Sequence, residues 1–316
     1  MSQVRLKALL KGIATYIPVL RTYACRSSGG TVSARYCYAV WMRHLVMAGR
    51  AGLDTDPRTV AELGPGDSMG IGLSALISGA DHYYALDAKP HVVAALNRSV
   101  CEELIGFFER RMPIPDALEF PLTAPRLDSY EFPSDILTEA RLARTLAPRR
   151  LDLIRRAVAG QSVTNREITI AYMAPWDDDA VIRPGEVDMV LSQAVLEHVE
   201  HVPETYKALR RWISPRGFMS HSIDFKSHGV AREWNGHWTI PAALWRVVRG
   251  NRPYLLNRLP LSRHVAAIKD ARFAVVRSFV REMDPLPRVE LAPDFTYLTD
   301  TDLSASGVFV QATPVG

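Results

Sequence analysis

The spacing of apolar residues changes character near residue 58. Before that point the spacing is helical: residues 4–17 place leucines and isoleucines on one face of a predicted helix, and residues 36–48 predict a second helix. After it, short apolar runs alternate with helical segments. We expect strands at 59–63, 82–86, 168–173, 187–191 and 217–223, and helices at 69–77, 91–104, 136–159 and 203–213.

This alternation predicts an α/β fold, a Rossmann-like doubly wound and mostly parallel sheet with helices on both faces. Two segments interrupt the rhythm: a Pro- and Arg-rich insertion at 105–165 and an Arg- and Trp-rich segment at 230–270. The last two apolar runs, 273–281 and 307–313, predict a closing β pair. We therefore expect an N-terminal helical extension over 1–57 and one domain over 58–316.

Composition changes this picture little. The chain has 316 residues, of which 47% are hydrophobic and 23% charged, values typical of a folded protein with a sizeable core. A net charge of +4 does not indicate nucleic acid as a partner. Three cysteines without a CxxC pair favour a reducing, cytoplasmic compartment, and no apolar run is long enough to cross a bilayer.

The N-terminal helix over 4–17 leaves two interpretations open. Its apolar face is flanked by Arg5, Lys7 and Lys11, a pattern typical of helices that lie on a membrane surface. The same face is also typical of a helix that packs on its own domain, which we expect here. Peripheral contact with the inner membrane is the alternative.

The most informative segment is a glycine turn after the first strand. Gly64 and Gly66 allow a tight turn that a ligand can approach closely, and the following helix presents free N–H groups. Glu62 precedes the turn, and Asp87 ends the second strand, where an acid can accept hydrogen bonds from both ribose hydroxyls. A dinucleotide and S-adenosylmethionine both remain open, although Met69 replaces the third glycine that favours a dinucleotide.

Taken over residues 59–313, the chain resembles class I S-adenosylmethionine-dependent methyltransferases. Residues 62–66 resemble the first motif of that family, and residues 187–199 resemble its fourth strand and the loop that follows. The resemblance implies a seven-stranded sheet with an antiparallel last strand, and S-adenosylmethionine as cofactor. The residues it implies for cofactor binding are Glu62, Gly64, Pro65, Gly66, Ser68, Asp87, Trp176, Asp177, Ser192 and Gln193.

Catalytic candidates follow the fourth and fifth strands. We predict His228 as general base for a hydroxyl, Asp224 as the carboxylate that orients it, and His198, beside Glu197, as a third member of the site. His221 lies inside a strand and is expected to be structural. Some relatives bind a metal with a glutamate three residues before the Glu-His pair; because that position is Ala194, we expect no metal.

The methyl acceptor we expect is a hydroxyl of a small molecule or a glycan precursor. Arg35 is a candidate for the cofactor carboxylate, and the arginines between 141 and 156 are candidates for an anionic acceptor. A solvated helix face is the simpler interpretation of that run. Two other functions stay open, an NAD(P)-dependent oxidoreductase and a non-catalytic methyltransferase-like scaffold. The sequence does not indicate the oligomeric state.

Overall fold

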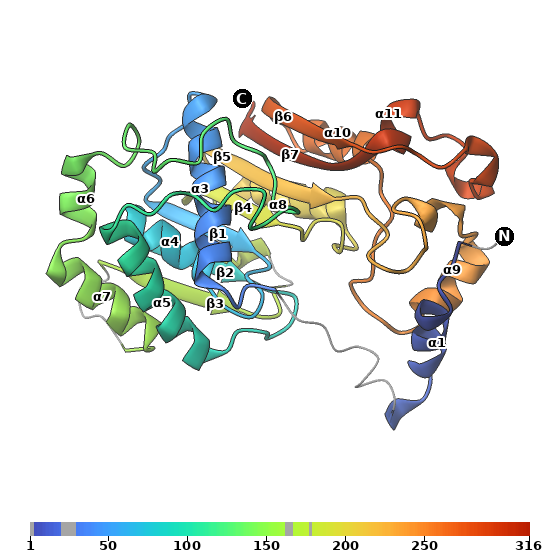
Figure 1. The fold of residues 1–316 in the computed structure, drawn as a ribbon, viewed down its shortest axis with the longest axis horizontal. Coiled ribbons are helices and arrows are strands. Elements are labelled where there is room, and N and C mark those ends of the chain that lie inside the picture. The colour runs from blue at the N-terminus through green and yellow to red at the C-terminus, as the bar shows by residue number, and fades with distance from the viewer. Residues whose placement is uncertain (1–2, 20–29, 162–166, 177–178) are drawn as a thin grey trace.

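The computed structural model describes residues 3–19, 30–161, 167–176 and 179–316 (Figure 1). Its centre is a mixed sheet of seven strands in the order β3-β2-β1-β4-β5-β7-β6. The strands from β3 to β5 are parallel, and β7 runs antiparallel to both of its neighbours. The strands are β1 (Thr59–Leu63), β2 (His82–Leu86), β3 (Thr169–Met173), β4 (Val187–Gln193), β5 (Ile213–Asp224), β6 (Phe273–Glu282) and β7 (Ala305–Pro314).

This sheet confirms the predicted α/β class. Strands β1 and β2 have the expected bounds, and β6 and β7 form the expected closing pair. The largest difference is β5, which begins at Ile213, four residues earlier than predicted. The antiparallel β7 is also the feature that the methyltransferase resemblance implied.

Helices cover both faces of the sheet. Successive β1 residues point to opposite faces, so each contributes to a different core. Val60 belongs to the core with α3 (Ala34–Arg50), α4 (Gly70–Ser78), α5 (Ala94–Glu109) and α7 (Pro148–Val158). Ala61 belongs to the core on the other face with α8 (Val202–Trp212) and α10 (Leu261–Asp270).

Helix α3 is part of the central core, although its residues were assigned to an N-terminal extension. Tyr38 and Trp41 are fully buried, and the Trp41 indole N–H donates to the Ser78 hydroxyl of α4 at 2.9 Å. Arg43 is also fully buried and donates to the carbonyls of Pro115 and Pro125 in the insertion. The helix therefore lies between the sheet layer and the insertion.

The basic helix expected over 136–159 is two helices. They are α6 (Glu139–Thr145) and α7, which begins at Pro148 after the extended residue Ala147. A proline is compatible with the first turn of a helix but not with its interior, so Pro148 starts a new helix instead of continuing the old one.

The chain beyond β5 extends away from the sheet and carries α9 (Ala242–Arg249), while α11 (Asp300–Ser304) precedes β7. Helix α1 (Leu6–Ala14) lies against α9, as Figure 1 shows. Among the described residues, no helix combines the length and the apolar character needed to cross a membrane. Helix α1 packs on its own chain as expected, but it buries Ala8 and Gly12 instead of the predicted face of leucines and isoleucines.

Candidate functional site

The polar residues predicted for the site gather at one edge of the sheet. Strands β1, β2, β4 and β5 are parallel, so their carboxyl ends meet there, and ligands of such sheets bind at this edge. The Gly64 turn follows β1, Asp87 follows β2, Glu197 follows β4 and His228 follows β5. The sequence analysis therefore brought together residues from four separate segments.

The glycine turn needs glycine for two reasons. Gly64 and Gly66 have φ values of +66° and +80°, which side chains with a Cβ adopt rarely. A Cβ on Gly64 would also lie 2.6 Å from Cγ2 of Val195 in the loop after β4. The Gly64 N–H donates to the carbonyl of Leu86 at 2.7 Å, which joins the turn to the end of β2. The turn is thus held between the two neighbouring strand ends.

Thr31, which the sequence analysis missed, fixes the far side of this turn. Its hydroxyl donates to the Pro65 carbonyl at 2.8 Å and accepts from the Ser68 N–H at 2.8 Å. The Ser68 hydroxyl donates to the Thr31 carbonyl at 2.5 Å and is itself buried. Ser68 therefore shapes the turn, and its side chain is committed to Thr31. No sequence signal pointed to this contact, because 34 residues separate Thr31 from Pro65.

Asp87 has the environment expected of a ribose-binding acid. The residue is 6% exposed, and its Oδ1 accepts from the Ala88 N–H at 2.8 Å. Its Oδ2 is buried without a hydrogen-bond partner among the described residues. Burial raises the pKa of this carboxyl group. A buried acceptor without a donor is unfavourable in the free protein, so the site fits a ligand that supplies hydroxyl groups.

Two predicted cofactor residues point into the interior instead. Glu62 is 1% exposed, accepts from the Tyr83 hydroxyl at 2.5 Å, and burial raises its pKa to about 7. Ser192 is fully buried, and its hydroxyl lies 2.8 Å from Nδ1 of His221, a histidine expected to be structural. These side chains contact other protein groups instead of facing the ligand site. The prediction that Glu62 and Ser192 contact the cofactor directly is therefore corrected.

The remaining cofactor candidates lie after β3 and at the end of β4. The Trp176 N–H donates to the Asp87 carbonyl at 3.1 Å, and its ring packs edge-to-face on Trp212, with centroids 5.4 Å apart. Asp177 lies outside the described residues. Gln193 keeps a buried side-chain oxygen that has no hydrogen-bond partner among the described residues. Trp176 and Gln193 therefore lie at the carboxyl edge, close to the ends of β2 and β4.

Three of the predicted side chains form a cluster after β4 and β5. Nε2 of His228 lies 4.0 Å from Oε1 of Glu197, and the rings of His198 and His228 pack edge-to-face with centroids 5.1 Å apart. Glu197 is 2% exposed, and neither of its carboxyl oxygens has a hydrogen-bond partner among the described residues. The sequence analysis assigned catalytic roles to His198 and His228 and named Glu197 only as the neighbour of His198; the structure places all three side chains together.

Burial sets the protonation of this cluster. It raises the pKa of Glu197 well above the usual range and lowers the pKa of His198 to about 4, with His228 acting in the same direction. The pKa of His228 is also lowered by burial, against the attraction of Asp224. At neutral pH the cluster therefore holds uncharged imidazoles beside a carboxyl group that favours its proton, an arrangement that can accept a proton from an acceptor hydroxyl.

Asp224 does not orient His228 by a hydrogen bond. Its Oδ2 lies 3.7 Å from Nε2 of His228, beyond hydrogen-bond distance, and the Lys226 ammonium lies 3.3 Å from both of its carboxylate oxygens. The Lys226 N–H also donates to Oδ1 at 2.9 Å. The predicted pairing is thus corrected: Asp224 acts on His228 by charge, and its hydrogen bonds go to Lys226.

Arg281 is a site residue that sequence reasoning missed. In the sheet register Gly307 of β7 pairs with Asp224 of β5 on one side and with Arg281 of β6 on the other. A Cβ on Gly307 would lie 2.4 Å from Nη2 of Arg281, so the glycine leaves room for the guanidinium. The positive charge of Arg281 also lowers the pKa of Glu197. Only the strand register reveals this neighbour, because 84 residues separate Arg281 from Glu197 in the sequence.

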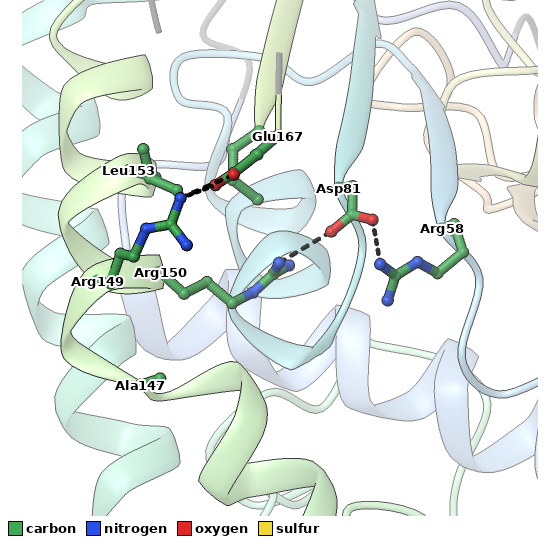
Figure 2. Close-up of a pocket in the computed structure, with 8 residues that line it drawn as sticks. Arg58, Asp81, Ala147, Arg149, Arg150, Leu153 and Glu167 are labelled. Atoms are coloured by element: carbon green, nitrogen blue, oxygen red, sulfur yellow. Dashed lines mark hydrogen bonds and ion pairs between the residues drawn. The ribbon is translucent and has the colours of Figure 1, made fainter. Parts of the chain in front are cut away.

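Arg35, Arg149 and Arg150, which were also predicted to bind ligands, are paired elsewhere. Arg35 makes two hydrogen bonds of 2.6 Å to Glu119 of the insertion, so it is not open to a cofactor carboxylate. Arg149 pairs with Glu167, and Arg150 and Arg58 both pair with Asp81 (Figure 2).

These paired arginines line a pocket of about 370 Å³ at the other edge of the sheet. Arg58 and Asp81 immediately precede β1 and β2, so the pocket lies at the amino ends of these strands. The glycine turn and the histidine cluster lie at their carboxyl ends. The prediction that the arginine run binds the methyl acceptor is therefore corrected, because Arg149 and Arg150 lie at the amino edge of the sheet and the candidate site lies at the carboxyl edge.

The histidine cluster also bears on the expectation of no metal. Glu197, His198 and His228 each offer a ligand-type atom, and these atoms lie within 4.8 Å of one another. Two imidazoles and a carboxylate form a donor set that suits several divalent ions. The absence of a glutamate at Ala194 therefore does not remove every metal-binding arrangement at this edge.

Comparison with known proteins gave matches only among solved structures. No family model and no curated protein matches the chain. An S-adenosylmethionine-dependent methyltransferase from Mesorhizobium loti is 15% identical, with 85% of this chain and 97% of that chain covered and a TM-score of 0.40. The geranyl diphosphate C-methyltransferase from Streptomyces coelicolor A3(2) is 11% identical, with 87% and 78% covered and a TM-score of 0.44.

Proposed function

We propose that this chain is an S-adenosylmethionine-dependent methyltransferase. The observation that carries the proposal is Asp87 Oδ2, a buried carboxylate oxygen without a partner beside the Gly64 turn. Asp87 would accept the ribose hydroxyls, and the turn would let the ligand approach the backbone at Gly64 and Gly66. When bound, the cofactor supplies an electrophilic methyl group. The sequence motifs that resemble the family lie at this same edge.

The acceptor we propose is a hydroxyl group of a small molecule or a glycan precursor, placed against the cluster after β4 and β5. His228 would take the hydroxyl proton at Nε2, because its side chain is the most exposed of the three, at 30%. Asp224, 3.7 Å away, would stabilise the imidazolium that forms. Glu197 and His198 would exclude water from the reacting oxygen.

An anionic acceptor is supported by Arg281, which replaces the arginine run in this role. Its guanidinium lies over Gly307, the β7 residue that pairs with Asp224, and its Nη1 donates to the Leu122 carbonyl at 3.2 Å. Arginine binds carboxylates and phosphates through two parallel hydrogen bonds. Arg281→Lys, which keeps the charge but loses this geometry, is expected to raise the KM of an anionic acceptor more than it lowers kcat.

Calorimetry on the purified chain tests the proposal. We expect S-adenosylmethionine to bind with a micromolar Kd and NADH not to bind, because Met69 occupies the position of the third glycine of a dinucleotide site. The reverse result, NADH binding without S-adenosylmethionine binding, would assign the site to an oxidoreductase. No binding of either ligand to the folded protein would favour a scaffold.

A His228→Gln variant tests the chemical step separately. General-base catalysis contributes about 10²–10⁴-fold to rate, so kcat is expected to fall by at least 100-fold while the Kd for S-adenosylmethionine is unchanged. His201→Gln is a matched control, because His201 precedes α8 outside the cluster. Unchanged kcat in His228→Gln would remove this residue from the mechanism.

A further inference from the structure

Helix α1 packs on α9 through its small residues. Ala8, Gly12 and Thr15 are buried, and a Cβ on Gly12 would lie 2.1 Å from the Val247 carbonyl. The Thr15 hydroxyl accepts from the Asn251 N–H at 2.8 Å, which fixes the end of the helix. The two backbones therefore approach so closely that no larger residue fits between them.

The opposite face of α1 is apolar and exposed. Leu6 and Leu10 are 68% and 55% exposed, and Ile13 and Ile17 are 45% and 49% exposed. The spacing of Leu6, Leu10 and Ile13 places them along one stripe of the helix, and Ile17 follows in the turn after the helix ends. Tyr16 is 60% exposed beside this stripe. Isolated exposed leucines are common, but a continuous apolar stripe on a helix marks a binding surface.

Positive charge flanks this stripe. Arg5, Lys7 and Lys11 are exposed, and residues 3–19 contain no aspartate or glutamate. Lys7 and Lys11 are one turn apart on the same side of the helix, and neither makes an ion pair with a described residue. A second copy of this helix would bring like charges together, whereas an anionic surface complements them.

We propose that the exposed apolar face of α1 (Leu6, Leu10, Ile13), extended by Tyr16 and Ile17 just after the helix and flanked by Lys7 and Lys11, binds an anionic lipid surface. The apolar side chains enter the boundary between headgroups and acyl chains, and the lysines contact the headgroups. The helix lies parallel to the surface, because its opposite face remains packed on α9. Binding is reversible and depends on salt, since part of it is electrostatic.

The chain that carries α9, on which α1 packs, leads back to the histidine cluster. Residues 250–259 lead from α9 back to the loop after β4, where the Asn257 side chain donates to the carbonyls of Leu196 and Val199 at 2.8 and 2.9 Å. The Asn257 N–H donates to the Glu197 carbonyl at 2.8 Å. If the proposed methyl transfer holds, on which this step rests, the acceptor is a hydroxyl compound carried at the membrane surface.

Co-sedimentation of the full chain with vesicles tests the docking. We expect binding to vesicles of 70% phosphatidylcholine and 30% phosphatidylglycerol, and weaker binding to phosphatidylcholine alone. The apolar variant Leu10→Ser/Ile13→Ser and the charge variant Lys7→Gln/Lys11→Gln should each bind the anionic vesicles at least about tenfold more weakly. Leu118→Ser/Val289→Ser is the matched control, since these residues are 93% and 92% exposed elsewhere, and it should bind like the wild type.

Three outcomes would overturn the proposal. These are wild-type binding in both helix variants, equal binding to neutral and anionic vesicles, and no binding at all by the folded chain. Self-association in sedimentation velocity that the apolar variant abolishes, without vesicle binding, would assign the face to a second copy. Calorimetry with S-adenosylmethionine on the same samples, without vesicles, separates the failure of docking from the failure of the proposed activity.

Discussion

Replacing Asp87 by asparagine is expected to weaken S-adenosylmethionine binding without unfolding the protein. The asparagine side-chain oxygen can still accept from the Ala88 N–H, which donates to Oδ1 of the aspartate at 2.8 Å. The amide nitrogen then takes the place of Oδ2, which has no partner among the described residues. A hydrogen-bond donor would therefore face ribose hydroxyls that need an acceptor.

The magnitude follows from the bond that is lost. A hydrogen bond to a charged group contributes about 1.5–3 kcal/mol, and each 1.4 kcal/mol corresponds to about a tenfold change in Kd. Loss of one such bond is thus expected to raise the Kd for S-adenosylmethionine by about 10–100-fold.

The stability of the free protein should change in the other direction. Burial raises the pKa of Asp87, so the folded state holds this proton more tightly than the unfolded state does. The free energy of unfolding therefore falls as the pH rises from the pKa of Asp87 in the unfolded state to its higher pKa in the folded state. At neutral pH the full cost of holding the buried carboxylate in its charged form is present. The neutral amide removes this penalty, so the Tm of Asp87→Asn at pH 7 should equal or exceed that of the wild type.

Calorimetric titration and thermal unfolding on the same samples measure both effects. Asp128→Asn is the matched control: its side chain is 94% exposed and pairs with Arg50, so neither Kd nor Tm should change appreciably. An unchanged Kd in Asp87→Asn would refute the assignment of this carboxylate to the cofactor. A weaker Kd together with a lower Tm would attribute the effect to loss of structure.

Gly64→Ala should destabilise the fold by about 1–3 kcal/mol more than Gly52→Ala in urea unfolding. Both glycines have positive φ, but only a Cβ on Gly64 would lie against Val195. Equal losses of unfolding free energy in the two variants would mean that the contact with Val195 relaxes freely. Burial lowers the pKa of His44 to about 4 and that of His221 to about 3, so both histidines make unfolding stability fall as the pH drops from 6.5 toward 4, whereas the raised pKa of Glu62 acts in the opposite direction. His44→Gln should remove one of the two histidine contributions, and a pH dependence identical to that of the wild type would contradict the assignment. Excess EDTA should leave kcat unchanged if the histidine cluster acts without a metal, whereas a loss that Mn²⁺ restores would identify an ion there.

Local pattern predicted most of the sheet, because strands β1 and β2 are short segments in which aliphatic, aromatic and β-branched residues predominate, bounded by polar and glycine residues. It also predicted which strand ends carry the site, since parallel strands share one carboxyl edge. Two elements were misread where local pattern does not decide. Helix α3 was assigned to an extension, although its burial depends on the sheet it covers, and α6 and α7 were joined across Pro148.

The sequence predicted where site residues lie along the sheet better than it predicted which residues their side chains contact. The arginines of α6 and α7 are typical of anion binding, yet Arg149 and Arg150 pair with acids at the amino edge of the sheet, Arg150 with Asp81. Composition does not say which edge a helix covers. Arg281 is the reverse case: it has no motif, but the register of β5, β7 and β6 places it across Gly307 from Asp224. Such pairings depend on strand register, which a single sequence does not specify across long connections.

Buried carboxyl oxygens without a hydrogen-bond partner in the described part of the chain support the carboxyl edge as the functional one. Imidazole nitrogens that no described residue pairs with also occur deep in the core, as Nε2 of His44 and of His221 do, but the core carboxyl group of Glu62 accepts from Tyr83. At the carboxyl edge, carboxyl oxygens of Asp87 and Glu197 are buried without hydrogen-bond partners among the described residues. Each such group costs the free protein about 1–3 kcal/mol. Apolar side chains at these positions would remove that cost, so the acids are better explained by bound ligands that donate to them.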